Sequence, residues 1–317
     1  MHPTVFLPMA AGYAPLVGHH RHLLDDEVRT RAFLDAIARV VKSGDTVADL
    51  GTGTGVLAIA ARRAGARHVW AIDRDPIVQV AAAIARDNGI DGITFIEQHS
   101  RTVELPEPVD VIVSECFGPM AIGGSMIPAV IDLRDRFGKP GVRVVPGTVT
   151  LVVAPVEVPE MYEHVAAFTK PRFGLAWNAA HRLAINNVYN TVVSPEALIA
   201  PAHAMHTVDL LRDQWTGRIE GRATWRATRA GLVHGLGGWF EADLGGSVTL
   251  STAPSAPATI WRQVVFPLPE PMRVERDTEI TATLACIHGE NFDWAGTIGA
   301  RTFRCSTRYS HPAALTP

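Results

Sequence analysis

The chain has few cysteines, no long apolar run and little excess charge, and each of these features argues against a class of protein or site. Its 317 residues include three cysteines, Cys116, Cys286 and Cys305, which are widely separated and form no Cys-x-x-Cys pair. This pattern argues against a disulfide framework and a cysteine-based zinc site, and favours a reducing compartment. No stretch reaches the roughly 18 apolar residues that a membrane-spanning helix needs, and the apolar N-terminal stretch has no basic lead-in. We therefore expect a soluble cytoplasmic protein without a membrane partner.

The charge balance is close to neutral. A formal net charge of -3 argues against a general nucleic-acid surface, so we expect no nucleic-acid partner. The three histidines His19, His20 and His22 lack a fourth ligand at a sensible spacing, so we expect no metal site there. A hydrophobic fraction of 47% is ordinary for a globular protein, and the length favours two domains over one.

The most informative motif is a glycine-rich turn after an apolar stretch, VADLGTGTG at 47–55. Alternating glycines let the backbone approach a cofactor closely, and an acid about 20 residues further on can hold a ribose diol. The spacing is G-x-G-x-G and not the pyrophosphate fingerprint G-x-G-x-x-G, and an acid ahead of it repels phosphate but suits a cation. S-adenosylmethionine, which carries an ammonium and a sulfonium, therefore fits better than NAD. The residues expected at this cofactor are Asp49, Gly51, Gly53, Gly55 and Asp73.

The secondary-structure signals change half-way along the chain. Strand and helix patterns alternate as far as about residue 113, which is typical of a parallel sheet with helices on both faces. After a Pro- and Gly-rich stretch at 140–147, short alternating runs separated by turns predict an antiparallel sheet or barrel. We therefore predict an α/β domain with N-terminal helices over 1–146 and a β domain over 147–317. A helical and aromatic segment at about 162–190 interrupts the strands as an inserted arm.

Blocks spread along almost the whole chain resemble the protein arginine methyltransferases and their bacterial relatives. Segment 26–31 (DEVRTR) resembles the family's D-E-V-R-T helix, and 49–55 its cofactor loop. Segment 114–118 (SECFG), continuing to Ser125 and Met126, is similar without gaps to the double-glutamate loop. Far downstream, 251–254 (STAP) and 259–263 (TIWRQ) resemble the S-T-x-P and T-H-W-K-Q segments. Separated matches of this kind argue against coincidence.

The resemblance implies methyl transfer from S-adenosylmethionine. It implies a Rossmann-like class I methyltransferase domain followed by a β-barrel, with a helical arm that forms a homodimer. It assigns Arg29 to the methionine carboxylate, to which a guanidinium can donate two parallel hydrogen bonds. It assigns Asp73 to the ribose and Met126 to the adenine and sulfur. Ser100 is carried over to the adenine contact, although the family has a valine and a glutamate where this chain has Ser100 and Arg101.

The departures from the family concern the methyl acceptor. Arginine methyltransferases hold a guanidinium between two carboxylates, whereas this chain keeps Glu115 and has Gly124 at the second position. The preceding aromatic is Gly123, and the histidine of T-H-W is Ile260. One carboxylate beside apolar groups pairs a desolvated cation only in part, so a roomier, less charged pocket is expected. The residues expected around the acceptor are Tyr13, His20, Phe117, Gly123, Gly124, Ile260 and Trp261, the last being equally a barrel core residue.

The leading functional prediction is a methyltransferase for a small-molecule or peptide acceptor in bacterial specialised metabolism. An N-H heteroaromatic such as an indole fits the pocket, with methylation on carbon or nitrogen, and Glu115 is the expected catalytic residue that orients the N-H and accepts its proton. Two alternatives remain. One is a protein arginine N-methyltransferase that tolerates the missing glutamate, and the other is a non-catalytic relative that binds the cofactor.

Overall fold

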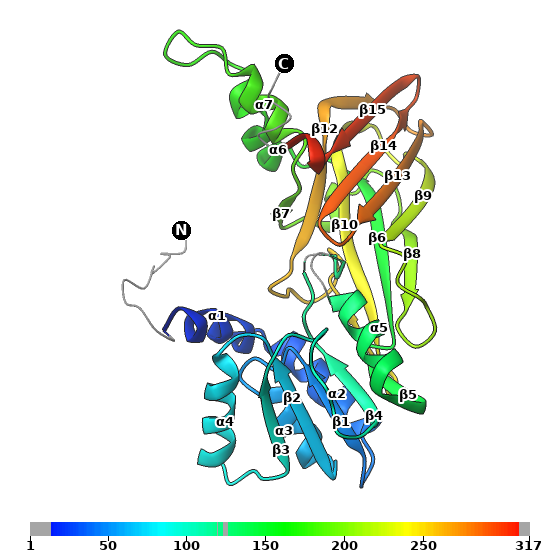
Figure 1. Cartoon of the computed structure of the whole chain (residues 1–317). Coiled ribbons are helices and arrows are strands. Elements are labelled where there is room, and N and C mark those ends of the chain that lie inside the picture. Colours follow the sequence, from blue (N-terminus) through cyan, green and yellow to red (C-terminus); the bar gives the residue numbers. More distant parts are fainter. Residues whose placement is uncertain (1–13, 119, 123–125, 311–317) are drawn as a thin grey trace.

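The computed structural model describes residues 14–118, 120–122 and 126–310 (Figure 1). Two helices, α1 (Ala14–Asp25) and α2 (Glu27–Val40), precede the first strand. Phe33, Ala36 and Ile37 recur at helical spacing on α2 and are buried against the core. Within the described ranges, no helix combines the length and the apolar character that crossing a bilayer requires.

A five-stranded parallel sheet follows, in the order β3-β2-β1-β4-β5. Its strands are β1 (Thr46–Leu50), β2 (His68–Asp73), β3 (Ile93–Glu97), β4 (Val109–Ser114) and β5 (Gly138–Val145). Helices α3 (Val56–Arg63), α4 (Ile77–Asp87) and α5 (Met126–Phe137) connect them. This is the strand order of a doubly wound sheet, in which ligands bind at the carboxyl ends of the strands. The predicted α/β class is confirmed.

The second half of the chain forms two antiparallel sheets. One has the order β7-β12-β10-β6-β8 with β11 beside β10, and the other the order β15-β14-β13-β9. Their strands are β6 (Thr148–Val156), β7 (Tyr189–Thr191), β8 (His203–Asp209), β9 (Arg218–Arg226), β10 (Gly231–Gly245), β11 (Val248–Ser251), β12 (Gln263–Val274), β13 (Glu279–Ile287), β14 (Asn291–Ile298) and β15 (Arg301–Ser306). Buried residues of both sheets form a common core that includes Phe240, Phe266 and Trp294.

Short helices interrupt the strands where the sequence predicted an arm. They are α6 (Pro159–Val165), the 3-10 turn η1 (Ala166–Phe168) and α7 (Asn178–Ala184). Two further 3-10 turns lie at Pro195–Ala197 and Thr307–Ser310. Figure 1 shows α6, α7 and the loop between them projecting from the end of the antiparallel sheets that is far from the parallel sheet. Phe173 in this loop has 95% of its surface exposed.

The two halves share contacts. Helix α2 packs on β10 and β11, and the Arg134 guanidinium on α5 donates to the carbonyl oxygens of Leu210 and Asp213, each at 2.9 Å. The last parallel strand ends at Val145 and the first antiparallel strand begins at Thr148, next to the proposed boundary at residue 146. The division into two domains stays a prediction.

Candidate active site

The glycine-rich turn between β1 and α3 has the backbone conformation that its glycines predicted. Gly51, Gly53 and Gly55 all have positive φ, of 75°, 53° and 81°. The turn is tied to the end of β2, because Gly53 N donates to Asp73 Oδ2 at 2.9 Å while Asp75 N donates to Asp73 Oδ1 at 3.0 Å. Asp73 is thereby held with lone pairs on both oxygens still available to hydroxyl donors.

Asp49 lies under this turn. Its side chain is 1% exposed, and its Oδ2 accepts a hydrogen bond from Thr52 Oγ1 at 2.6 Å, while Oδ1 has no partner among the described residues. Burial raises the pKa of the Asp49 carboxyl to about 7, and the Thr52 hydrogen bond opposes that rise. Asp49 therefore contacts the glycine turn through Thr52 and does not line the cavity beside the turn, and its role toward a cationic cofactor stays a prediction.

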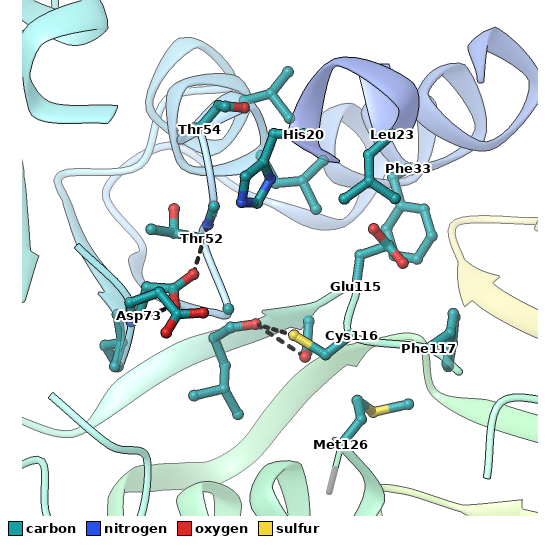
Figure 2. A pocket seen from close by; sticks show the side chains of 18 of the residues that line it. His20, Leu23, Phe33, Thr52, Thr54, Asp73, Glu115, Cys116, Phe117 and Met126 are labelled. Atoms are coloured by element: carbon teal, nitrogen blue, oxygen red, sulfur yellow. Dashed lines mark hydrogen bonds between the residues drawn. The ribbon is translucent and has the colours of Figure 1, made fainter. Parts of the chain in front are cut away.

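A cavity of about 570 Å³ opens between the carboxyl ends of β1, β2 and β4 and the helices α1 and α2 (Figure 2). Eleven residues expected at the site line it: His20, Arg29, Gly51, Gly53, Asp73, Ser100, Glu115, Phe117, Met126, Ile260 and Trp261. Asp49 and Gly55 do not line it, and Tyr13, Gly123 and Gly124 lie outside the described residues. The cavity has the size of a small-molecule pocket.

His20 of α1 covers the glycine turn. A Cβ added to Gly53 would lie 2.8 Å from His20 Cε1, so the imidazole sits directly over this glycine. Burial and the neighbouring His19 lower the pKa of His20, and Asp73 and Asp75 act in the opposite direction. The structure thus gives His20 a pocket-lining position.

Arg29 and Glu115 form an ion pair at the other end of the cavity. Their side chains are only 6% and 11% exposed. The Arg29 guanidinium also donates to the Leu23 carbonyl oxygen at 2.7 Å, and its Nε has no partner among the described residues. Burial lowers the pKa of Arg29, which Asp26 opposes. Figure 2 shows Asp73 and Glu115 on opposite sides of the pocket, with Cys116 between them in this view.

The wall next to Glu115 is aromatic and apolar. Phe117 packs against Trp261 and Phe240, with ring centroids 5.6 Å and 5.0 Å away. Trp261 Nε1 donates to the Phe117 carbonyl oxygen at 3.0 Å, so the indole N-H is already used. Trp261 is 6% exposed, and it is therefore a core residue with one edge at the cavity. Ile260 also lines the cavity and is 38% exposed.

Sequence reasoning missed several lining residues. Cys116 follows Glu115, is exposed to the cavity, and lies where a Cβ on Gly51 would overlap its sulfur. Desolvation of the sulfur by the surrounding protein atoms raises the pKa of the Cys116 thiol to about 11. Asn190, whose Nδ2 donates to the Trp261 carbonyl oxygen at 2.8 Å, comes from β7. The position of Cys116 in the matched loop could have indicated its place, whereas nothing in the sequence links Asn190 to Trp261.

Comparisons with known proteins agree with this architecture. A family model described as the arginine methyltransferase oligomerization subdomain matches residues 148–294, and one described as ribosomal protein L11 methyltransferase (PrmA) matches residues 4–123. The chain is 32% identical over 279 residues to protein arginine N-methyltransferase 6 of Xenopus tropicalis, covering 84% of this chain and 82% of that protein. The chain belongs to the protein arginine N-methyltransferase family.

Solved structures of arginine methyltransferases share the fold. A chain of the Trypanosoma brucei PRMT1 enzyme-prozyme heterotetrameric complex with AdoHcy has a TM-score of 0.85 and 25% identity, covering 93% of this chain and 100% of that chain. Arabidopsis thaliana protein arginine methyltransferase 10 has a TM-score of 0.78 and 22% identity, with the same coverage. These likenesses confirm the predicted order of a Rossmann-like methyltransferase domain followed by a β-barrel domain.

This arginine methyltransferase relative is an S-adenosylmethionine-dependent methyltransferase, as its family and structural neighbours show. The site fits that cofactor. Arg29 Nε, which finds no partner within the described part of the chain, is a buried donor at the cavity and suits a carboxylate, and the fixed oxygens of Asp73 suit a ribose diol. The roles of the individual residues stay predictions.

Proposed function

We propose that the methyl acceptor is an uncharged planar N-H heteroaromatic, such as an indole, carried by a small molecule or peptide. The observation that carries the proposal is the pairing of Glu115 with Arg29 at the acceptor end of the cavity. Among the described residues that line the cavity, the other carboxylates are Asp73 and Asp75. Asp73 accepts a hydrogen bond from the glycine turn, and the backbone N-H of Asp75 donates to Asp73. Both carboxylates therefore lie at the end of the cavity where the ribose is expected, away from Glu115.

A guanidinium would meet an unfavourable charge balance at this end. Glu115 already faces one buried cation, and the family's second glutamate is replaced by Gly124, which has no side chain. A second desolvated cation would have to share the Glu115 carboxylate with Arg29. This is unfavourable, because the effective penalty of burying an ion is several kcal/mol and half a carboxylate does not offset it. An N-H group that stays neutral avoids this penalty and still gives Glu115 a donor.

The neighbouring walls favour the same class of acceptor. Phe117 and Trp261 present aromatic surface, and Ile260 presents an aliphatic side chain where the family has the histidine of T-H-W. The indole N-H of Trp261 is not free for the acceptor, because it already donates a hydrogen bond to the Phe117 carbonyl oxygen. Apolar walls with one carboxylate match a planar ring that carries a single N-H.

The chain's residues then have defined tasks. Arg29 would hold the carboxylate of S-adenosylmethionine through Nε, which has no partner among the described residues, while its Nη1 stays paired with Glu115. Asp73 would hold the ribose, and the cofactor supplies an electrophilic methyl group whose bonding electrons stay on sulfur. Glu115 would orient the acceptor N-H and accept its proton as the new bond to carbon 3 or to nitrogen forms, so charge does not build up on the ring. The aromatic walls would exclude water from the reacting atoms.

The test is transfer from S-adenosylmethionine labelled in the methyl group. The acceptors are indole, N-acetyltryptophanamide and an Arg-Gly-rich peptide, each with wild type and Glu115→Gln. We expect transfer to a tryptophan-type acceptor and a fall of 10²- to 10⁴-fold in Glu115→Gln, the usual range for a general base. Transfer to the Arg-Gly peptide alone would support an arginine methyltransferase. Binding of the cofactor without transfer to any of the three would contradict the proposal.

The arm supports a further part of this proposal, a homodimer. Phe173 and Leu175 between α6 and α7 are 95% and 59% exposed, and large exposed apolar side chains favour burial against a partner. The arm lies within the match to the oligomerization subdomain. A role in bacterial specialised metabolism and a cytoplasmic location stay predictions of the sequence.

A further inference from the structure

The Asp26 carboxylate joins two segments that are distant in the sequence. Its Oδ1 accepts a hydrogen bond from Arg29 N at 3.0 Å, which caps the start of α2. Its Oδ2 accepts one from Ile260 N at 2.7 Å, across 234 residues of chain. One half-buried side chain thus fixes both the helix that carries Arg29 and the segment that carries Ile260.

These two bonds belong to a closed ring of contacts around the acceptor end of the cavity. From Ile260 the chain leads to Trp261, whose Nε1 donates to the Phe117 carbonyl oxygen. Phe117 is two residues after Glu115, which pairs with Arg29, and Arg29 lies one turn beyond Asp26. Every step of the ring is a hydrogen bond, an ion pair or a short stretch of chain, so the ring sets where Glu115 lies relative to the apolar wall.

Capping alone does not require a carboxylate at position 26. Asn and Ser cap helices about as well as Asp, because one side-chain oxygen suffices for one backbone N-H. Accepting two N-H groups on separate oxygens does require a carboxylate, since the amide nitrogen of Asn would point a donor at another donor. The second bond, to Ile260 N, is therefore the feature that a cap does not explain.

We propose that Asp26 is a positioning residue that holds the Ile260 and Trp261 segment against the site of Glu115 and Arg29. The proposal rests on the proposed function, because it treats this segment as the acceptor wall. Asp26 binds the backbone of residue 260 and not its side chain. The side chain at 260 is therefore free to set acceptor selectivity while the backbone stays in place, and here it is isoleucine.

The test compares Asp26→Asn and Asp26→Ser with wild type. Both variants keep a capping oxygen, and both lose the acceptor for Ile260 N. We expect amide hydrogen exchange at Ile260 to become at least tenfold faster in each. With N-acetyltryptophanamide as acceptor, kcat/KM should fall at least tenfold, because small misplacements of reacting groups are costly. The Kd of S-adenosylhomocysteine should stay within threefold of wild type.

Asp26→Ala separates this role from capping, because it loses both bonds. If Asp26 only caps α2, the Asn and Ser variants will match wild type in exchange and in kcat/KM, and Ala alone will differ; that result overturns the proposal. If wild type methylates the Arg-Gly peptide instead, the proposed function fails, and kcat/KM is measured with that peptide. If wild type transfers methyl to neither, exchange at Ile260 still decides whether Asp26 holds the segment.

Discussion

Replacing Glu115 by Gln should destabilise the cofactor-free protein far more than replacing an exposed carboxylate on the neighbouring helix. The Arg29–Glu115 pair is 6% and 11% exposed, so the change leaves a buried guanidinium without its anion. Breaking a buried pair in this way costs about 3–5 kcal/mol, and the Gln oxygen keeps one hydrogen-bond acceptor, so about 3 kcal/mol is expected. With an unfolding entropy of about 2.1 cal/mol/K for each of the 317 residues, this lowers Tm by about 5 °C if the chain unfolds as one unit.

The matched control is Glu27→Gln, which breaks the Arg31–Glu27 pair on α2. Those side chains are 75% and 73% exposed, and an exposed pair is worth about 0.3–0.5 kcal/mol, so Tm should move by less than about 1 °C. Thermal denaturation followed by circular dichroism measures both. Adding Arg29→Met to Glu115→Gln should restore most of the loss, because neither position of the pair then carries a buried charge. Equal melting of Glu115→Gln and Glu27→Gln would refute the buried pair.

Three further predictions concern the cofactor end and the arm. The pKa of Asp49 is raised to about 7 from an ordinary 3.8, so the native state binds more protons than the unfolded state between about pH 4 and 7. The free energy of unfolding should therefore fall with rising pH by up to about 4 kcal/mol more in wild type than in Asp49→Asn; parallel urea-denaturation profiles would contradict this. Asp73→Ala should weaken S-adenosylhomocysteine binding at least tenfold in calorimetry, because charged hydrogen-bond acceptors contribute about 1.5–3 kcal/mol, and an unchanged Kd would remove Asp73 from the site. Phe173→Asp with Leu175→Asp should give a monomer in sedimentation analysis, and an unchanged mass would place the interface elsewhere.

The parallel half of the fold could be predicted from local sequence patterns. The strand at 46–50, the three glycines and Asp73 are close in sequence and each has a strong conformational or chemical preference, so the turn and its acid could be predicted. Strand β12 runs to Val274 although Pro267, Pro269 and Pro271 interrupt its strand pattern, so its second half does not follow from the sequence. Strand β5 contains Pro140 and Gly141 and was read as a boundary for the same reason.

The acceptor end depends on long-range contacts that no local pattern contains. The resemblance assigned Arg29 to the cofactor carboxylate, and the structure adds its pair with Glu115. The bonds from Ile260 to Asp26 and from Trp261 to Phe117 join residues that are separated by 234 and 144 positions. Their geometry follows from how the antiparallel sheets pack on the helices, which composition and spacing do not specify.

The central claim is that one carboxylate, already paired, does not recognise a guanidinium. The most direct measurement is the ratio of kcat/KM for an Arg-Gly-rich peptide to that for N-acetyltryptophanamide, in wild type and in Gly124→Glu. We predict that wild type favours the tryptophan acceptor and that the added carboxylate shifts the ratio at least tenfold towards arginine. A wild type that prefers the arginine peptide, with a ratio that Gly124→Glu leaves unchanged, would contradict the account.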